Sequence, residues 1–233
     1  MTSNYVWNQK KKSTGADAGS TAGTKCRSTV KAGRAESAAA YHTGANAVGN
    51  RNYQQDALYV SDSKRLAANK KTRVLALVCD GMGGMADGGK ASRTAIQMMV
   101  QGFRSVEKEP QLNIPAFFRQ GIYATDQMIS SFPKENGRGS GTTMVACIVE
   151  DNKLYWASVG DSRIYIIRDH QMQQVTRDHN YWLRLQEKVA AGEMTMEEAM
   201  AQRHKEALIS YLGMGNVSLM DINTEHLPSS TGI

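Results

Sequence analysis

Four short stretches of the sequence contain residue types that could bind a metal ion or a phosphate group. The first is LALVCD, which ends in Asp80 and is followed by the glycine-rich sequence GMGG. An aspartate at the end of a buried strand is either a turn residue or an oxygen ligand held rigidly for a hard cation. Glycines such as Gly81, Gly83 and Gly84 permit positive φ and leave backbone carbonyl groups accessible. Neither the GxGxxG pattern nor the Gly-Lys-Ser/Thr of a phosphate-binding loop follows, so nucleotide binding is disfavoured.

The other three stretches are polar segments next to predicted strands. In GNRNYQQDAL, Arg51 suits a bidentate grip on a phosphate, and Asp56 suits a metal ion or a metal-bound water. In SVGDSRIYI, Asp161 lies in a predicted turn, where aspartate is also an ordinary turn residue. In TRDHN, Asp178 and His179 could equally be polar surface residues. Each stretch by itself therefore keeps a purely structural interpretation.

Hydrophobic patterns predict the elements that would position these residues. Alternating or continuous β-type runs predict strands over 38–43, 56–62, 73–80, 143–149, 153–159, 164–168 and 172–175. Apolar residues at helical spacing predict helices over 90–103, 114–129, 183–191 and 195–209, the last one opened by a capping box of Thr195 and Glu198. Because helices and antiparallel strands come in separate blocks, the pattern favours an α+β fold over a Rossmann-type fold.

The positive charge is concentrated near the N-terminus. The 233-residue chain has a net charge of +6, and residues 1–36 hold seven Lys and Arg residues against two acids. This segment is rich in Ser, Thr, Gly, Ala and Lys, so it is predicted to be a disordered basic tail in front of one domain over 37–233. A basic tail could contact nucleic acid through its phosphates, but a solvated leader is the favoured interpretation.

The cysteines and the apolar segments predict a cytoplasmic protein without a membrane partner. Cys26, Cys79 and Cys147 are far apart and odd in number, so they predict neither a disulfide framework nor a zinc site. Cys79 and Cys147 lie in apolar runs, where a free cysteine is usually a small buried hydrophobe. This usage fits a reducing compartment. No apolar run is long enough to span a membrane, and no signal peptide is recognisable.

The order and spacing of the four stretches resemble the metal-dependent, type 2C serine/threonine protein phosphatases. Arg51 and Asp56 come first, followed by the strand that leads to DGMGG, and then SGTT, GDSR and T-x-DH. The DGMGG form is most similar to bacterial members, and the resemblance covers about residues 38–215. It implies a four-layer αββα sandwich in which two antiparallel sheets pack face to face. It also implies a flap-like helical segment at about 183–210.

The resemblance further implies hydrolysis of phosphoserine and phosphothreonine in proteins by a water activated between two Mn²⁺ or Mg²⁺ ions. Asp80 would bridge the two ions, Gly81 would offer its carbonyl group to one of them, and Asp56 would hold a metal ion or its waters. Asp161 would help to form a third, weaker metal site, and Arg51 would grip the substrate phosphate. The implied partners are phosphorylated proteins and the serine/threonine kinase that produces them. The sequence predicts no oligomeric state.

The resemblance is incomplete towards the C-terminus. Family members carry two further metal-binding aspartates in their last quarter, one in an Asp-Gly pair and one in an Asp-Asn pair. In this sequence those pairs occur only at 80–81, 87–88 and 151–152. We therefore expect a C-terminally truncated phosphatase domain, and two interpretations stay open. The protein is either a metal-dependent phosphatase or an inactive phosphatase or pseudophosphatase that binds phosphoproteins as a regulatory module.

Overall fold

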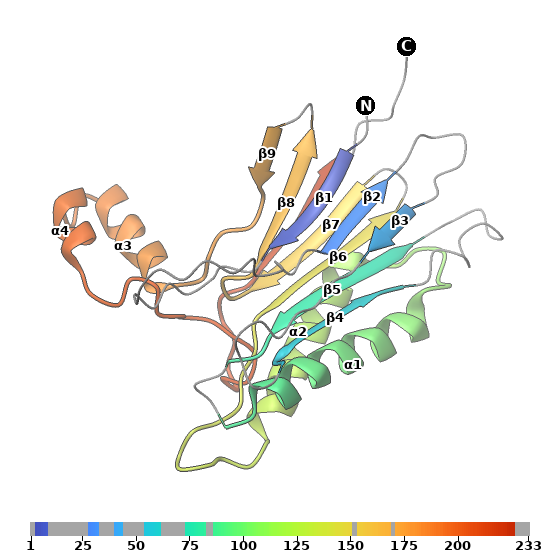
Figure 1. Ribbon diagram of the computed structural model, residues 1–233, viewed down its shortest axis with the longest axis horizontal. Helices are drawn as coiled ribbons and strands as arrows, with labels where there is room; N and C mark the ends of the chain where they lie inside the picture. The colour runs from blue at the N-terminus through green and yellow to red at the C-terminus, as the bar shows by residue number, and fades with distance from the viewer. Residues whose placement is uncertain are drawn as a thin grey trace, which may run out of the picture.

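The computed structural model describes residues 3–8, 28–32, 40–43, 54–61, 73–82, 86–150, 153–168 and 171–226. Within these residues the strands form two antiparallel five-stranded sheets (Figure 1). Sheet 1 has the order β3 (Ala40–Thr43), β2 (Ser28–Ala32), β1 (Ser3–Asn8), β8 (Arg163–Arg168) and β9 (Gln171–Gln174). Sheet 2 has the order β10 (Asp221–His226), β7 (Lys153–Val159), β6 (Met144–Glu150), β5 (Val74–Asp80) and β4 (Asp56–Val60).

Two long helices cover the outer face of sheet 2 (Figure 1). They are α1 (Gly88–Val106) and α2 (Ile114–Ser130), and each begins at a side-chain cap, Asp87 for α1 and Asn113 for α2. Their apolar faces bury Phe103 and Phe118 against strand residues such as Leu77. This packing forms the larger of the two hydrophobic cores in the described part of the chain.

The opposite face of sheet 2 packs on sheet 1. Strand residues alternate between the two faces, so Ala76, Cys147 and Trp156 point away from the helices and meet Ile164 and Ile166 of β8 in a second core. The described layers are therefore helices, sheet 2 and sheet 1. The predicted α+β fold with face-to-face antiparallel sheets is confirmed.

Two further helices lie apart from α1 and α2 (Figure 1). They are α3 (Tyr181–Ala190) and α4 (Met196–Ala201), and the capping box of Thr195 and Glu198 opens α4 as predicted. The predicted helix over 195–209 is too long, because α4 ends at Ala201. The backbone N–H groups of Tyr181 and Trp182 bond the carbonyl groups of residues 207 and 205, and this pairing draws 205–208 out of helical geometry. None of the described helices is long and apolar enough to cross a membrane.

The structure differs from the predicted disordered tail at two segments. β1 pairs with both β2 and β8, so two pieces of residues 1–36 belong to sheet 1. The short β-type sequences YVW and STV are diluted by the polar residues around them, which is why overall composition missed them. The rest of 1–36 lies outside the described residues, so the boundaries of the tail and of the domain stay a prediction.

Candidate metal site

Asp56 and Asp80 lie directly opposite each other at the end of sheet 2. They are register partners in the pairing of β4 with β5. Both share the strand face of Ala76 and Val78, which packs toward sheet 1. Side chains that are opposed in this way have Cβ atoms about 4.5–5.5 Å apart, and two like charges there destabilise the sheet unless a cation neutralises them. The structure thus brings together two of the predicted metal ligands at the end of the layer between the sheets.

Backbone contacts rather than a positive φ account for Gly81. A Cβ atom at this position would lie 2.2 Å from the carbonyl oxygen of Gly88 and 2.6 Å from that of Gln55. The Gly81 N–H group donates to the Gln55 carbonyl at 3.2 Å. The φ of Gly81 is not positive, so the positive φ that glycine permits is not used at this residue. Gly83 and Gly84 lie outside the described residues.

The SGTT segment, residues 140–143, forms hydrogen bonds that hold the backbone of Asp80. The Asp80 N–H group donates to Thr143 Oγ1 at 3.2 Å, and the Asp80 carbonyl accepts from Thr142 Oγ1 and from the Thr143 N–H group, both at 2.9 Å. Thr143 Oγ1 also lies 2.6 Å from Ser162 Oγ in the GDSR stretch. These bonds fix the position from which the Asp80 carboxylate projects, in keeping with a structural role for the threonines and Ser162.

The turn that carries Asp161 lies at the same end of sheet 2. It connects β7 to β8 and begins at Gly160, whose φ is 102°. A Cβ atom on Gly160 would lie 2.6 Å from Thr143 Cγ2, so the turn packs against the residue that holds Asp80. Asp161 is half-buried. Its role in a third metal site stays a prediction.

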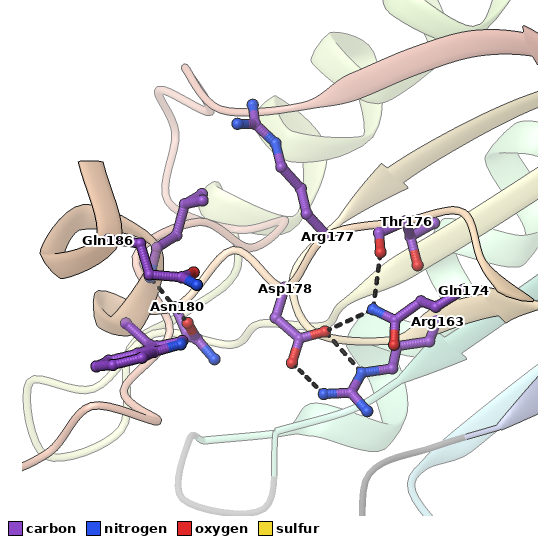
Figure 2. Close-up of a pocket in the computed structure, with 9 residues that line it drawn as sticks. Arg163, Gln174, Thr176, Arg177, Asp178, Asn180 and Gln186 are labelled. Atoms are coloured by element: carbon purple, nitrogen blue, oxygen red, sulfur yellow. Dashed lines mark hydrogen bonds and ion pairs between the residues drawn. The ribbon is translucent and has the colours of Figure 1, made fainter. Parts of the chain in front are cut away.

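Asp178 and His179 are not the surface residues that TRDHN alone allowed. Asp178 accepts from Arg163 Nε at 2.7 Å and from Nη2 at 2.5 Å (Figure 2), and this bidentate bond raises the pKa of Arg163. The His179 side chain is fully buried. In addition, Thr176 Oγ1 accepts from the Ile164 N–H group at 3.1 Å. The GDSR and TRDHN stretches therefore form one hydrogen-bonded unit.

Sequence reasoning missed two acidic residues, Asp221 and Asp126, that make hydrogen bonds near the site. Asp221, at the start of β10, accepts from Arg177 Nε at 2.8 Å and lies 3.2 Å from His179 Nε2. Burial raises the pKa of Asp221, but the hydrogen bonds from His179 and Arg177 outweigh it and lower the pKa to about 2. Asp126 in α2 is also buried. Its spacing of four from Ile122 and three from Ile129 places it on the apolar helix face, and this signal could have identified it.

A pocket of about 370 Å³ opens between the start of β8, the end of β9 and the start of α3 (Figure 2). Its lining includes Arg163, Gln174, Asp178 and Trp182. It is lined by residues of 163–186, and Asp56, Asp80 and Gly81 are not part of it. The predicted metal site is therefore separate from this pocket.

The donor set fits part of a divalent-metal site. Two carboxylates at the ends of the paired strands β4 and β5, followed by the Gly81 carbonyl, are the hard oxygen ligands that Mg²⁺ and Mn²⁺ prefer. In the described ranges, no group of three or more His, Cys, Asp or Glu side chains is placed to hold an ion. Arg51, the predicted phosphate ligand, lies outside the described residues.

The two described cysteines are structural. Cys79 and Cys147 are buried and free. Burial raises the pKa of both thiols, to about 12 for Cys147, so neither forms the thiolate that nucleophilic catalysis requires.

Comparison with known proteins identifies the family. The sequence profile described as protein phosphatase 2C matches residues 43–220. The chain belongs to the protein phosphatase 2C family. The serine/threonine phosphatase stp of Listeria monocytogenes is 30% identical over 156 residues, which are 66% of this chain and 61% of that protein. This phosphatase 2C chain thus spans about three fifths of the length of that curated relative.

Solved structures of phosphatases have the same fold. The serine/threonine phosphatase Stp1 of Staphylococcus aureus is similar with a TM-score of 0.59 and 28% identity, over 76% of this chain and 67% of that one. The catalytic domain of the serine/threonine phosphatase PstP, in complex with two manganese ions, has a TM-score of 0.53 and 27% identity, over 76% of this chain and 68% of that one. The family predicted from the sequence is confirmed.

Proposed function

We propose that the protein hydrolyses phosphoserine and phosphothreonine in other proteins, with Mn²⁺ or Mg²⁺ ions as cofactors. The observation that carries the proposal is the pairing of Asp56 with Asp80 at the end of sheet 2, next to the Gly81 carbonyl. Membership of the phosphatase 2C family supports the substrate class. The two manganese ions of the PstP structure support the choice of metal.

The chain's own residues would hold two ions and the substrate at one end of the sheets. Asp80 would bridge the ions, Asp56 would hold one of them or its waters, and Gly81 would contribute its carbonyl oxygen. When bound, two divalent cations lower the pKa of a water molecule and neutralise charge on the phosphoryl oxygens. Because SGTT fixes the Asp80 backbone and strand pairing fixes that of Asp56, the carboxylates need little reorganisation to act.

Arg51 and Asp161 complete the proposed site. Arg51 lies five residues before Asp56, and its planar guanidinium suits two parallel hydrogen bonds to a phosphate. Asp161 would contribute to a third, weaker ion site, and its turn packs against Thr143.

We also propose a cytoplasmic location and a serine/threonine kinase as functional counterpart. The location is supported by the two buried, free cysteines. A kinase is implied because a phosphoprotein phosphatase needs a reaction that supplies its substrate.

Release of phosphate from a phosphothreonine peptide in the presence of Mn²⁺ tests this function. We expect turnover that EDTA abolishes and that Asp80→Asn lowers by at least about a hundredfold, since the substitution removes a charge needed to hold the cations. The control is Asp87→Asn, the same chemical change at the exposed cap of α1, where asparagine caps as well as aspartate. Turnover that needs no divalent ion, or that survives Asp80→Asn, would contradict the proposal.

A further inference from the structure

The imidazole ring of His179 is enclosed between the Gly160 turn and Asp221 of β10. The ring is fully buried, and both of its nitrogens have partners. The Gly160 N–H group donates to His179 Nδ1 at 3.2 Å, and His179 Nε2 lies 3.2 Å from Asp221 Oδ2. The backbone of His179 makes a further contact, because its N–H group donates to the Gly160 carbonyl at 2.9 Å.

These contacts select one tautomer of the ring. Because a backbone N–H group points at Nδ1, that nitrogen carries no proton. The proton is then on Nε2, where the carboxylate of Asp221 accepts it. Asp221 is oriented in turn by two bonds from Arg177, at 2.8 and 3.0 Å. Asp221 and Gly160 together therefore fix both the orientation and the tautomer of the ring.

Residue 179 satisfies both backbone polar groups of Gly160. Gly160 has a φ of 102°, a conformation that side-chain-bearing residues rarely adopt. On its other side, the turn packs against Thr143, the residue that holds the Asp80 backbone. Asp161 follows directly, so the position of its carboxylate depends on where Gly160 is held.

We propose that His179 is a positioning residue that holds the Gly160–Asp161 turn against Thr143 and thereby places Asp161 for its ligand role. The link to Asp161 rests on the proposed function, which treats this aspartate as a metal ligand. The hold on the turn does not rest on it, and the two parts are tested separately.

The hold on the turn is tested by NMR and by amide hydrogen exchange. In the unmodified protein we expect the ¹⁵N shifts of His179 to show a bare Nδ1 and a protonated Nε2. A ring with a proton on Nδ1 would overturn the proposal, and this measurement needs no variant to fold.

Two substitutions then separate the contribution of the hydrogen bond at Nδ1 from that of the hydrogen bond at Nε2. His179→Asn keeps an acceptor near the position of Nδ1 and loses the bond to Asp221, whereas His179→Gln keeps a donor near the position of Nε2 and loses the acceptor for Gly160. We expect the Gly160 amide to exchange about tenfold faster in His179→Gln than in His179→Asn. A merely structural role would loosen both variants alike, so equal exchange rates would overturn the proposal.

The link to Asp161 is tested by Mn²⁺ calorimetry in a double-mutant cycle. We expect His179→Gln to weaken Mn²⁺ binding severalfold when Asp161 is present and to have no further effect in the Asp161→Asn background. Additive losses would overturn the link. If the unmodified protein bound no Mn²⁺, the proposed function and the link would fail together, while the exchange rates would still decide whether His179 holds the turn.

Discussion

Gly81 illustrates how one residue without a side chain lets three backbone segments meet beside the proposed metal site. Its Cα approaches the carbonyl groups of both Gln55 and Gly88, which belong to segments far apart in the sequence. The metal-binding geometry therefore depends on a close backbone approach as well as on the two carboxylates.

We predict that Gly81→Ala destabilises the fold by about 1–3 kcal/mol, since the new methyl group would overlap backbone atoms that have little freedom to move. Urea denaturation of the two proteins measures the difference in the free energy of unfolding. Gly139→Ala is the matched control, because a Cβ atom there meets no heavy atom within 4 Å, and we expect it to change stability by less than about 0.5 kcal/mol. Equal stabilities of Gly81→Ala and Gly139→Ala would show that the close approach is not real.

At this scale, sequence reasoning placed the two acids at strand ends but did not explain the glycine. Asp56 begins one predicted strand and Asp80 ends another, but their position opposite each other depends on the register of β4 with β5, which the sequence did not predict. The reason for Gly81 depends on Gln55 and Gly88, which local patterns cannot bring into contact. The burial of His179 depends in the same way on β10, a strand that the sequence did not predict.

At the scale of elements, the buried acid Asp126 ties α2 to the loop that returns toward β10. Asp126 Oδ1 accepts from the N–H groups of Gly213 at 2.8 Å and Gly215 at 3.1 Å, and Oδ2 accepts from that of Val217 at 3.1 Å. The loop in turn pairs with the SGTT segment, because the N–H group of Leu212 donates to the Thr142 carbonyl at 2.9 Å. Asp126 thus supports the segment that holds Asp80.

We predict that Asp126→Asn lowers the free energy of unfolding by about 3 kcal/mol, because the amide keeps one acceptor oxygen and turns an N–H donor toward buried N–H groups. Thermal and urea denaturation would measure the loss. Asp87→Asn, the same change at an exposed helix cap, should cost less than about 0.5 kcal/mol. A loss no larger than that of the control would mean that Asp126 does not anchor the loop.

The positions of three helices were predictable because local sequence signals set them. The capping box placed the start of α4, and apolar spacing placed α1 and α2. The end of α4 was not predictable, since a tertiary pairing of 205–208 with the start of α3 overrides the helical spacing beyond Ala201.

At the scale of the whole molecule, Asp221 connects the two sheets through charge. Asp221 belongs to β10 of sheet 2, whereas its partners Arg177 and His179 follow β9 of sheet 1. The pKa of Asp221 is lowered to about 2, below the value of about 3.9 for an unfolded aspartate. The ionised carboxylate therefore stabilises the fold above about pH 4, and this contribution is lost as the pH falls toward 2.

We predict that Asp221→Asn removes this pH-dependent contribution. At pH 6 the variant should be less stable than the unmodified protein by on the order of 1 kcal/mol, a modest value because solvent screens the half-exposed Arg177. The difference should shrink as the pH falls from 4 toward 2. Urea denaturation at pH 6, 4 and 3 measures it, and a difference that stays constant across this range would contradict the assignment.

The α+β architecture could be predicted because helices and antiparallel strands come in separate blocks along the sequence and the turns between the strands are polar. The composition of residues 1–36 hid β1 and β2, whose pairing with β8 is a long-range property of the fold. Hydrophobic periodicity predicted the strands and helices, whereas the expected roles of individual residues as metal ligands came from the family resemblance.

The central claim is that Asp56 and Asp80 are ligands of a divalent-metal site. Calorimetric titration with Mn²⁺ tests this claim most directly. The account predicts that the unmodified protein binds Mn²⁺, that Asp56→Asn and Asp80→Asn each weaken binding by at least about tenfold, and that Asp87→Asn leaves it unchanged. Absence of Mn²⁺ binding by the unmodified protein, or equal binding by all three variants, would contradict it.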